Sequence, residues 1–99
     1  MTAYLIGKLV VKNWDWYREY RSVTEPLVAE YGGRYLVKGG DSTKLEGSDV
    51  AGDATVMIAF PNRKAILDWY ADPRYAPMKD LRRKSGTVAD LLVVDGLPD

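Results

Sequence analysis

The sequence predicts a single α+β domain over residues 1–99, in which a four-stranded antiparallel sheet carries helices on one side. Three observations support this prediction. Segments rich in β-branched and aliphatic residues occur near both ends and in the middle of the chain. Two longer stretches between them repeat their apolar residues at helical spacing. Glycine, proline and asparagine residues separate the segments, and the length suits one hydrophobic core.

The first predicted strand covers residues 4–11. One alternate set of its side chains is wholly apolar and the other is mixed, so one face lies in the core. The apolar set consists of Ala3, Leu5, Gly7, Leu9 and Val11. A helix follows, with Asn13 as its predicted N-cap and Asp15 near the positive end of its dipole.

Aromatic and apolar residues between Trp14 and Tyr31 share one side of this helix. Pro26 lies inside it and predicts a kink or a break near residues 23–25, because proline cannot donate the helical hydrogen bond. The pair Gly32-Gly33 ends the helix, since glycine readily adopts the left-handed conformation of a C-terminal cap.

Two further strands are predicted in the middle of the chain. Residues 34–38 form a short strand, and residues 39–43 form a turn-rich stretch. Residues 44–53 are mostly polar and show no period. Residues 54–60 are nearly all apolar, which is typical of a strand in the centre of a sheet.

The second helical region is predicted to consist of two pieces. Asn62 caps the first piece. Asp72 ends it and caps the second, with Pro73 at the first helical position, where its missing N–H costs nothing. Gly86 ends the second piece, and residues 87–94 form the last strand.

The resulting order is β-α-β-β-α-β, the ferredoxin-like arrangement, with its second helix split. Helices on one side of the sheet leave the other side bare. Because a large apolar face does not stay in water, we expect two copies to pack these faces together as a homodimer.

Composition excludes several classes of function. Fourteen basic and fourteen acidic side chains cancel, so no long-range field attracts nucleic acid. The chain has no cysteine and no histidine, which removes the commonest metal ligands and the usual haem ligand. We therefore expect no metal and no cofactor. No signal peptide or apolar stretch of roughly 20 residues is present, so we expect a cytoplasmic protein without membrane contact.

Arg34, Leu36 and Lys38 are alternate residues of the second strand, so they are predicted to share one face of it. If this face is the barrel interior, the two cations could grip a carboxylate or a phosphate. Glu46 is the nearest counter-charge in the sequence. The alternative is a structural ion pair or a solvated edge strand.

Aromatic residues of the helices form a second candidate ligand site, an apolar cleft with a few polar tips between helices and sheet. The candidates are Tyr20, Trp69, Tyr70, Tyr75 and Arg82. The alternative is that these rings belong to the core. Glu46 is also a candidate catalytic base, because burial would raise its pKa.

Several motifs, in a fixed order, resemble one bacterial family. They are Ala3-Tyr4, Tyr17, Tyr20, residues 31–40 (YGGRYLVKGG), Leu45-Glu46-Gly47, Phe60-Pro61, Trp69-Tyr70, Pro73, Tyr75 and Arg82. Over residues 3–96 the chain resembles the family called domain of unknown function 1330, a branch of the dimeric α/β-barrel proteins. The resemblance implies a fold and a dimer, and no established reaction.

Three functions remain open at this point. The first is a dimer that binds a small anionic or aromatic metabolite without catalysis. The second is a cofactor-independent enzyme of the isomerase, oxygenase or lyase type, suggested by analogy of fold alone. The third is a structural or partner-binding dimer. Nucleic-acid binding is disfavoured by the absence of a basic stripe.

Overall fold

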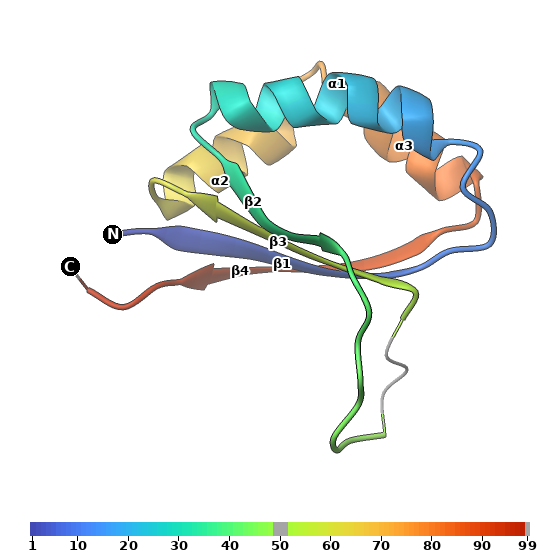
Figure 1. The fold of residues 1–99 in the computed structure, drawn as a ribbon. Coiled ribbons are helices and arrows are strands. Elements are labelled where there is room, and N and C mark those ends of the chain that lie inside the picture. The colour runs from blue at the N-terminus through green and yellow to red at the C-terminus, as the bar shows by residue number, and fades with distance from the viewer. Residues whose placement is uncertain (49–51, 99) are drawn as a thin grey trace.

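The fold is an antiparallel sheet of four strands with three helices on one face, as the computed structural model of the chain shows (Figure 1). The structure describes residues 1–48 and 52–98. The elements in chain order are β1 (Ala3–Val10), α1 (Tyr17–Glu30), β2 (Arg34–Gly39), β3 (Ala54–Phe60), α2 (Arg63–Ala71), α3 (Ala76–Lys84) and β4 (Val88–Asp95).

The strands lie in the order β2-β3-β1-β4, and every neighbouring pair is antiparallel. This confirms the predicted ferredoxin-like fold with a split second helix. Asn62 caps α2 as predicted, because its Oδ1 accepts a hydrogen bond of 2.8 Å from the backbone N–H of Ala65. Asp72 and Pro73 do form the break, but α3 begins only at Ala76.

The first helix differs from the prediction in two ways. It runs unbroken from Tyr17 to Glu30 with Pro26 inside it. Pro26 is exposed, while Leu27 and Val28 beside it are buried, so tertiary packing keeps the helix continuous across the proline and the predicted break is absent. Asn13 lies in a turn before the helix, where its Oδ1 accepts from the backbone N–H of Asp15.

A register shift in β2 separates the two cations that the sequence placed on one face. Tyr35 lies opposite Ile58 and Val37 lies opposite Met57, so the strand contains an extra residue between them. A one-residue shift turns every later side chain to the other face. Lys38 therefore points to the helix side and Arg34 to the uncovered side, and the prediction of a shared face is wrong.

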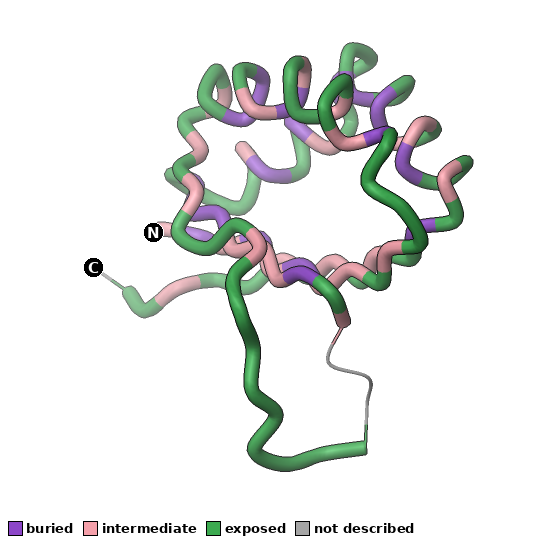
Figure 2. Tube along the Cα trace, turned by 45° about the vertical axis from the view of Figure 1, so that its right-hand side comes forward, coloured by how far each residue is buried: buried purple, intermediate pink, exposed green. Residues whose placement is uncertain are grey.

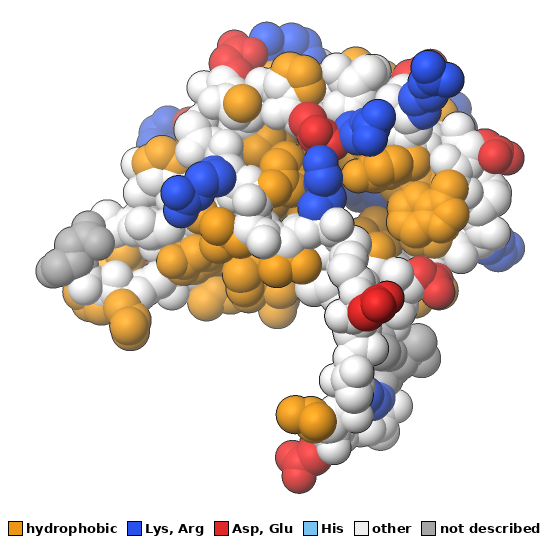
Figure 3. Space-filling model, viewed as in Figure 1, with side chains coloured by type: hydrophobic (Ala, Val, Ile, Leu, Met, Phe, Trp, Pro, Cys, Tyr) orange, Lys and Arg blue, Asp and Glu red, His pale blue; other side chains and the backbone are white. Residues whose placement is uncertain are grey.

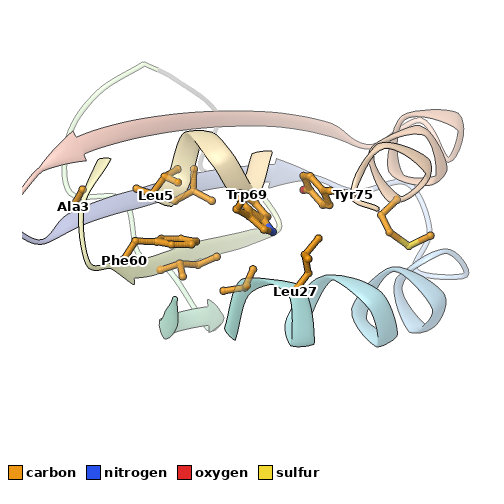
Figure 4. Packing of buried hydrophobic residues seen from close by; sticks show 10 residues of the cluster. Ala3, Leu5, Leu27, Phe60, Trp69 and Tyr75 are labelled. Carbon is orange, nitrogen blue, oxygen red and sulfur yellow. The ribbon is translucent and has the colours of Figure 1, made fainter. Parts of the chain in front are cut away.

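The hydrophobic core lies between the sheet and the helices, where the buried residues of both layers face one another (Figure 2). Phe60, Leu27 and Tyr75 gather around the buried indole of Trp69 (Figure 4). The ring centroids of Trp69 and Tyr75 are 4.5 Å apart. This aromatic centre joins β3, α1, α2 and the start of α3.

The other face of the sheet carries no helix. Its exposed apolar side chains come mainly from β4 and β1, namely Val88, Leu92, Val94 and Val10. The loop between β2 and β3 extends away from the helices on this side, and residues 41–48 are all exposed (Figure 1). One face of the sheet is thus left without a covering layer in the single chain.

Gly33 sits where the end of α1 comes close to β3. A Cβ at this position would lie 2.5 Å from Val28 Cγ1 and 2.9 Å from Phe60 Cε1, and both side chains are buried. We expect Gly33→Ala to lower the free energy of unfolding by about 1–3 kcal/mol through overpacking. Urea denaturation followed by tryptophan fluorescence measures this, and an unchanged transition midpoint would contradict the packing described.

Candidate functional site

A cavity of about 210 Å³ lies between the helix side of the sheet and the helices. It exists because α2 packs directly on the sheet, whereas α1 and α3 pack on each other above it. Apolar strand residues line its sheet side, namely Leu5, Val56, Ile58 and Leu91. Its other walls come from the segment around α1 and from the α2–α3 region, namely Trp14, Trp16, Tyr17, Tyr20, Thr24, Trp69, Tyr75 and Arg82.

The cavity opens toward one edge of the molecule. Of its lining residues, Trp14 and Lys38 are exposed, whereas Trp16 and Tyr75 are buried. The space-filling view shows the molecule hollowed between α1 and the sheet, with apolar, basic and acidic side chains around the hollow (Figure 3). A small molecule therefore has a route to the interior through apolar and cationic groups.

Arg82 of α3 is the most deeply placed charge in the site. Its side chain reaches the cavity with only 4% of the residue exposed. Its Nη1 donates to the phenolic oxygens of Tyr75 at 3.0 Å and of Tyr20 at 3.3 Å. These two oxygens are 2.6 Å apart and share a hydrogen bond. The three side chains join α1 to α3 across the cavity wall.

The positive charge of Arg82 has no anionic partner within the described residues. The side-chain ion pairs among residues 1–48 and 52–98 are formed by other arginines and lysines. The phenol of Tyr75 does not supply a negative charge, because burial raises its pKa well above its ordinary value and the neighbouring Tyr20 raises this pKa further. Arginine itself stays protonated in proteins. The cavity wall thus contains an uncompensated cation.

Three residues of the cavity wall each carry a polar side-chain atom that is sealed from solvent and, among the described residues, has no hydrogen-bond partner. Within the described part of the chain, the buried side-chain atoms without a hydrogen-bond partner are Thr24 Oγ1, Trp69 Nε1 and Arg82 Nε. All three residues line the cavity. A buried polar group without a partner costs about 1–3 kcal/mol, so the three together are a substantial cost unless something satisfies them.

Lys38 differs from Arg82 because its charge is paired. Its Nζ donates to Glu25 Oε2 at 3.0 Å and lies 5.1 Å from the centroid of the Tyr35 ring. Burial raises the pKa of Tyr35 well above its usual range, so this phenol also stays neutral. The ammonium group of Lys38 at the rim is therefore paired with the carboxylate of Glu25.

The structure brings together most of the predicted ligand residues. Tyr20, Lys38, Trp69, Tyr75 and Arg82 all line the same cavity. The prediction missed Thr24 and Trp16. Thr24 follows Tyr17 and Tyr20 at helical spacing and could have been found from that pattern, whereas Trp16 precedes the helix and has no such signal.

Three predicted residues lie elsewhere. Tyr70 contacts the rings of Trp69 and Tyr75 but lines a second depression with Arg83 and Thr87, which Arg82 borders as well. Arg34 is exposed on the uncovered side of the sheet.

Glu46 is exposed in the loop between β2 and β3 and is absent from the described lining of the cavity. The burial that would make it a base is therefore not found in the single chain.

The fold and the cavity are those of a small α+β protein of the ferredoxin-like type. Residues 2–97 match the family described as Domain of unknown function (DUF1330). The chain belongs to this family. The comparison with curated proteins gives no significant match.

Solved structures support the same fold. A protein of unknown function from Rhodopseudomonas palustris is 18% identical with a TM-score of 0.73, covering 99% of this chain and 84% of its own. A dimeric ferredoxin-like protein of unknown function from Jannaschia sp. CCS1 is 14% identical with a TM-score of 0.65, covering 93% and 98%. SnoaB, a cofactor-independent oxygenase from Streptomyces nogalater, is 17% identical with a TM-score of 0.56, covering 99% and 95%.

Two absences hold for the described residues. No helix among them has the length and apolar character needed to cross a membrane. No group of three or more His, Cys, Asp or Glu side chains among them is placed to hold a metal ion.

Thr24→Val tests whether the buried hydroxyl is unpaired in the folded protein. The substitution keeps the branched shape and removes the hydroxyl, so we expect the free energy of unfolding to stay equal or rise by about 1 kcal/mol. Urea denaturation of ligand-free protein measures this, with Thr24→Ala as a control that removes volume as well. A clear loss of stability in Thr24→Val would mean that the hydroxyl has a partner.

Proposed function

We propose that the protein binds a small anionic or aromatic metabolite in the cavity between the sheet and the helices. The observation that carries this proposal is Arg82, which among the described residues is a buried cation without a carboxylate partner, in a wall made mainly of apolar and aromatic side chains. An unpaired buried charge costs several kcal/mol. A bound anion would supply the missing negative charge and offset this cost.

The aromatic walls support the same proposal. Ligand sites are typically concave and apolar, with a few convergent polar groups. Here the polar groups are the guanidinium of Arg82 and the paired phenols of Tyr20 and Tyr75, with Lys38 at the rim. Most of the other lining side chains are aliphatic or aromatic.

Binding is favoured over catalysis because the described lining contains no Asp, Glu or His side chain that could act as a general base. The likeness to a cofactor-independent oxygenase lies in the fold, and fold does not determine reaction. One feature does favour an enzyme as the second candidate. The Tyr20–Tyr75 pair, which accepts from Arg82, is a proton donor that could stabilise developing charge on a bound carbonyl.

Removal of the Arg82 charge tests the proposed binding site. Native mass spectrometry of protein purified from its own host, before and after denaturation, is expected to reveal a small released mass. Arg82→Met is expected to lose this mass, and Arg82→Lys is expected to retain part of it because the charge remains.

The control is Arg83→Met, since Arg83 is an exposed neighbour on the same helix and lies outside the cavity. Circular dichroism establishes that each variant is folded. Retention of the same mass by folded Arg82→Met would contradict the proposed site, and so would a wild-type protein that carries no mass and binds no anion.

We also propose that the protein is a homodimer that packs the uncovered faces of its two sheets together. Leu92 and Val88 of β4 are 62% and 59% exposed in the single chain, and Val94 lies on the same face. Lys8 and Asp90 lie opposite each other on this face between the apolar side chains. A monomer rarely exposes so many large apolar side chains on one face. The exposed loop of residues 41–48 extends on this same side, where it can lie beside a second copy (Figure 1). The dimeric protein from Jannaschia sp. CCS1 has the same fold.

A charge in the uncovered face tests the dimer. We expect Leu92→Glu to convert the dimer into a monomer in sedimentation velocity, because a buried unpaired carboxylate opposes association. The matched control is Leu67→Glu, which changes a leucine of α2 that is 53% exposed on the opposite layer. A monomeric wild type, or a Leu92→Glu variant that stays dimeric, would contradict the proposed interface.

A further inference from the structure

Two opposite charges lie among the apolar side chains of the uncovered sheet face. Lys8 of β1 and Asp90 of β4 are opposite each other in register, so their side chains share one face. Leu5 of β1 points into the core, and Lys8, at an odd spacing from it along the strand, points the other way. The register pairs that flank the two charges on this face are apolar, namely Val10 with Val88 and Ile6 with Leu92. The charges therefore lie within the surface proposed as the dimer interface.

These two charges are unpaired in the single chain. Among residues 1–48 and 52–98, no ion pair or hydrogen bond involves the side chain of Lys8 or of Asp90. Directly opposed residues of an antiparallel pair have Cβ atoms about 5 Å apart, yet the charged ends of these two side chains do not form an ion pair with each other. Both side chains border an open hollow in the face, together with Thr55. The hollow gives both charged groups access to a molecule that packs on this face.

Formation of the proposed dimer removes these charges from solvent. The flanking apolar side chains exclude water when they pack against a second copy, and a charge that is buried without a partner is costly. A two-fold interface brings the same surface of both copies together. If Lys8 of one copy meets Asp90 of the partner subunit, then Asp90 of the first copy meets the partner's Lys8. A single arrangement of the two copies therefore pairs all four charges.

The direction of the two-fold axis determines whether the charges attract or repel each other. An axis that runs along β1 and β4, between the two strands, stacks Lys8 over Asp90 of the partner subunit. An axis that runs across the strands at the level of these residues stacks Lys8 over the partner's Lys8. Like charges placed opposite each other across an interface oppose association, so the charges favour the first direction. Arg34 is a further cation on this side, but it belongs to the edge strand β2, with β3 between it and β1.

From these observations we propose that Lys8 of each copy pairs with Asp90 of the other, and that these two equivalent ion pairs fix the orientation in which the two sheets pack. The inference rests on the homodimer proposed above and names the contacts that determine its geometry. The apolar side chains drive association, because their burial is favourable in any orientation. The charges select among the orientations, since they are satisfied in one and opposed in another.

A chain with the two charges exchanged tests this proposal. Lys8→Asp/Asp90→Lys leaves the net charge unchanged and keeps opposite charges side by side within the chain, so we expect it to fold and to form its own homodimer. In a mixed dimer with the wild-type chain, both contacts join like charges. Random pairing of equal amounts makes about half of all dimers mixed, and we expect the mixed share to fall to about one-tenth or less. Native mass spectrometry after subunit exchange measures this share, with the wild-type chain labelled with a heavy nitrogen isotope.

The matched control exchanges an ion pair on the helix layer. Lys64 and Asp68 of α2 form an exposed pair, with Nζ and Oδ2 2.6 Å apart. Lys64→Asp/Asp68→Lys makes the same charge changes away from the uncovered face, so we expect about half of its dimers with the wild-type chain to be mixed.

Single variants provide the test if the exchanged chain does not fold. When Lys8→Glu and Asp90→Lys chains are combined, only the mixed dimer joins opposite charges across the interface. We expect the mixed share to rise to about nine-tenths. The combination of Lys64→Glu with Asp68→Lys has the same net charges and controls for attraction between oppositely charged chains.

The outcomes separate the ion pairs from the dimer itself. A mixed share as large as that of the control would overturn the ion pairs and leave the dimer in place, because the charges would then act only within their own chain. A mixed share of wild-type and exchanged chains above the control would overturn the proposed orientation, because like charges would then face each other in the wild-type dimer. A wild type that sediments as a monomer would overturn the dimer and this inference together.

Discussion

The candidate site of this protein depends on the burial of the Arg82 guanidinium between α1 and α3. A cation in that position needs hydrogen-bond acceptors and a counter-charge. The chain supplies the acceptors as the two phenols of Tyr20 and Tyr75, which come from different helices. Within the described residues it supplies no counter-charge. The two phenols therefore satisfy part of the hydrogen bonding of the buried cation. On the proposed function, a bound anion supplies the opposite charge.

The arrangement of the helices makes room for that molecule. The break at Asp72 and Pro73 redirects the chain after α2, so that α2 packs on the sheet and α3 packs on α1. The junction is held in place by Asp72, whose carboxylate accepts from the Tyr31 hydroxyl and from Arg74. These hydrogen bonds hold the pKa of Asp72 well below its usual range. These contacts join the end of α1 to the junction between α2 and α3.

Much of the fold could be predicted because the spacing of apolar residues, every second position in strands and every third or fourth in helices, follows the buried face of each element. The apolar set of β1 and the helical stripe that contains Tyr17 and Tyr20 both correspond to the buried side of their elements. The prediction was wrong where tertiary packing overrides a local rule. Pro26 does not break α1, because buried neighbours hold it. An extra residue in β2 reverses the side on which Lys38 lies, and no pattern in the sequence marks that residue.

The sequence predicted most of the residues of the candidate site, but it could not predict which of their polar atoms are paired. Helical faces grouped Tyr20, Tyr75 and Arg82 correctly, but spacing cannot reveal which polar atoms lack partners. That property emerges only from the three-dimensional arrangement of Thr24, Trp69 and Arg82. The most direct test is a crystal structure of protein purified from its native host. The proposed binding site predicts density for a bound small molecule in the cavity, with an acceptor atom about 3 Å from an accessible nitrogen of the Arg82 guanidinium. A carboxylate of the protein itself in that position, from the same copy or from a second one, would contradict it.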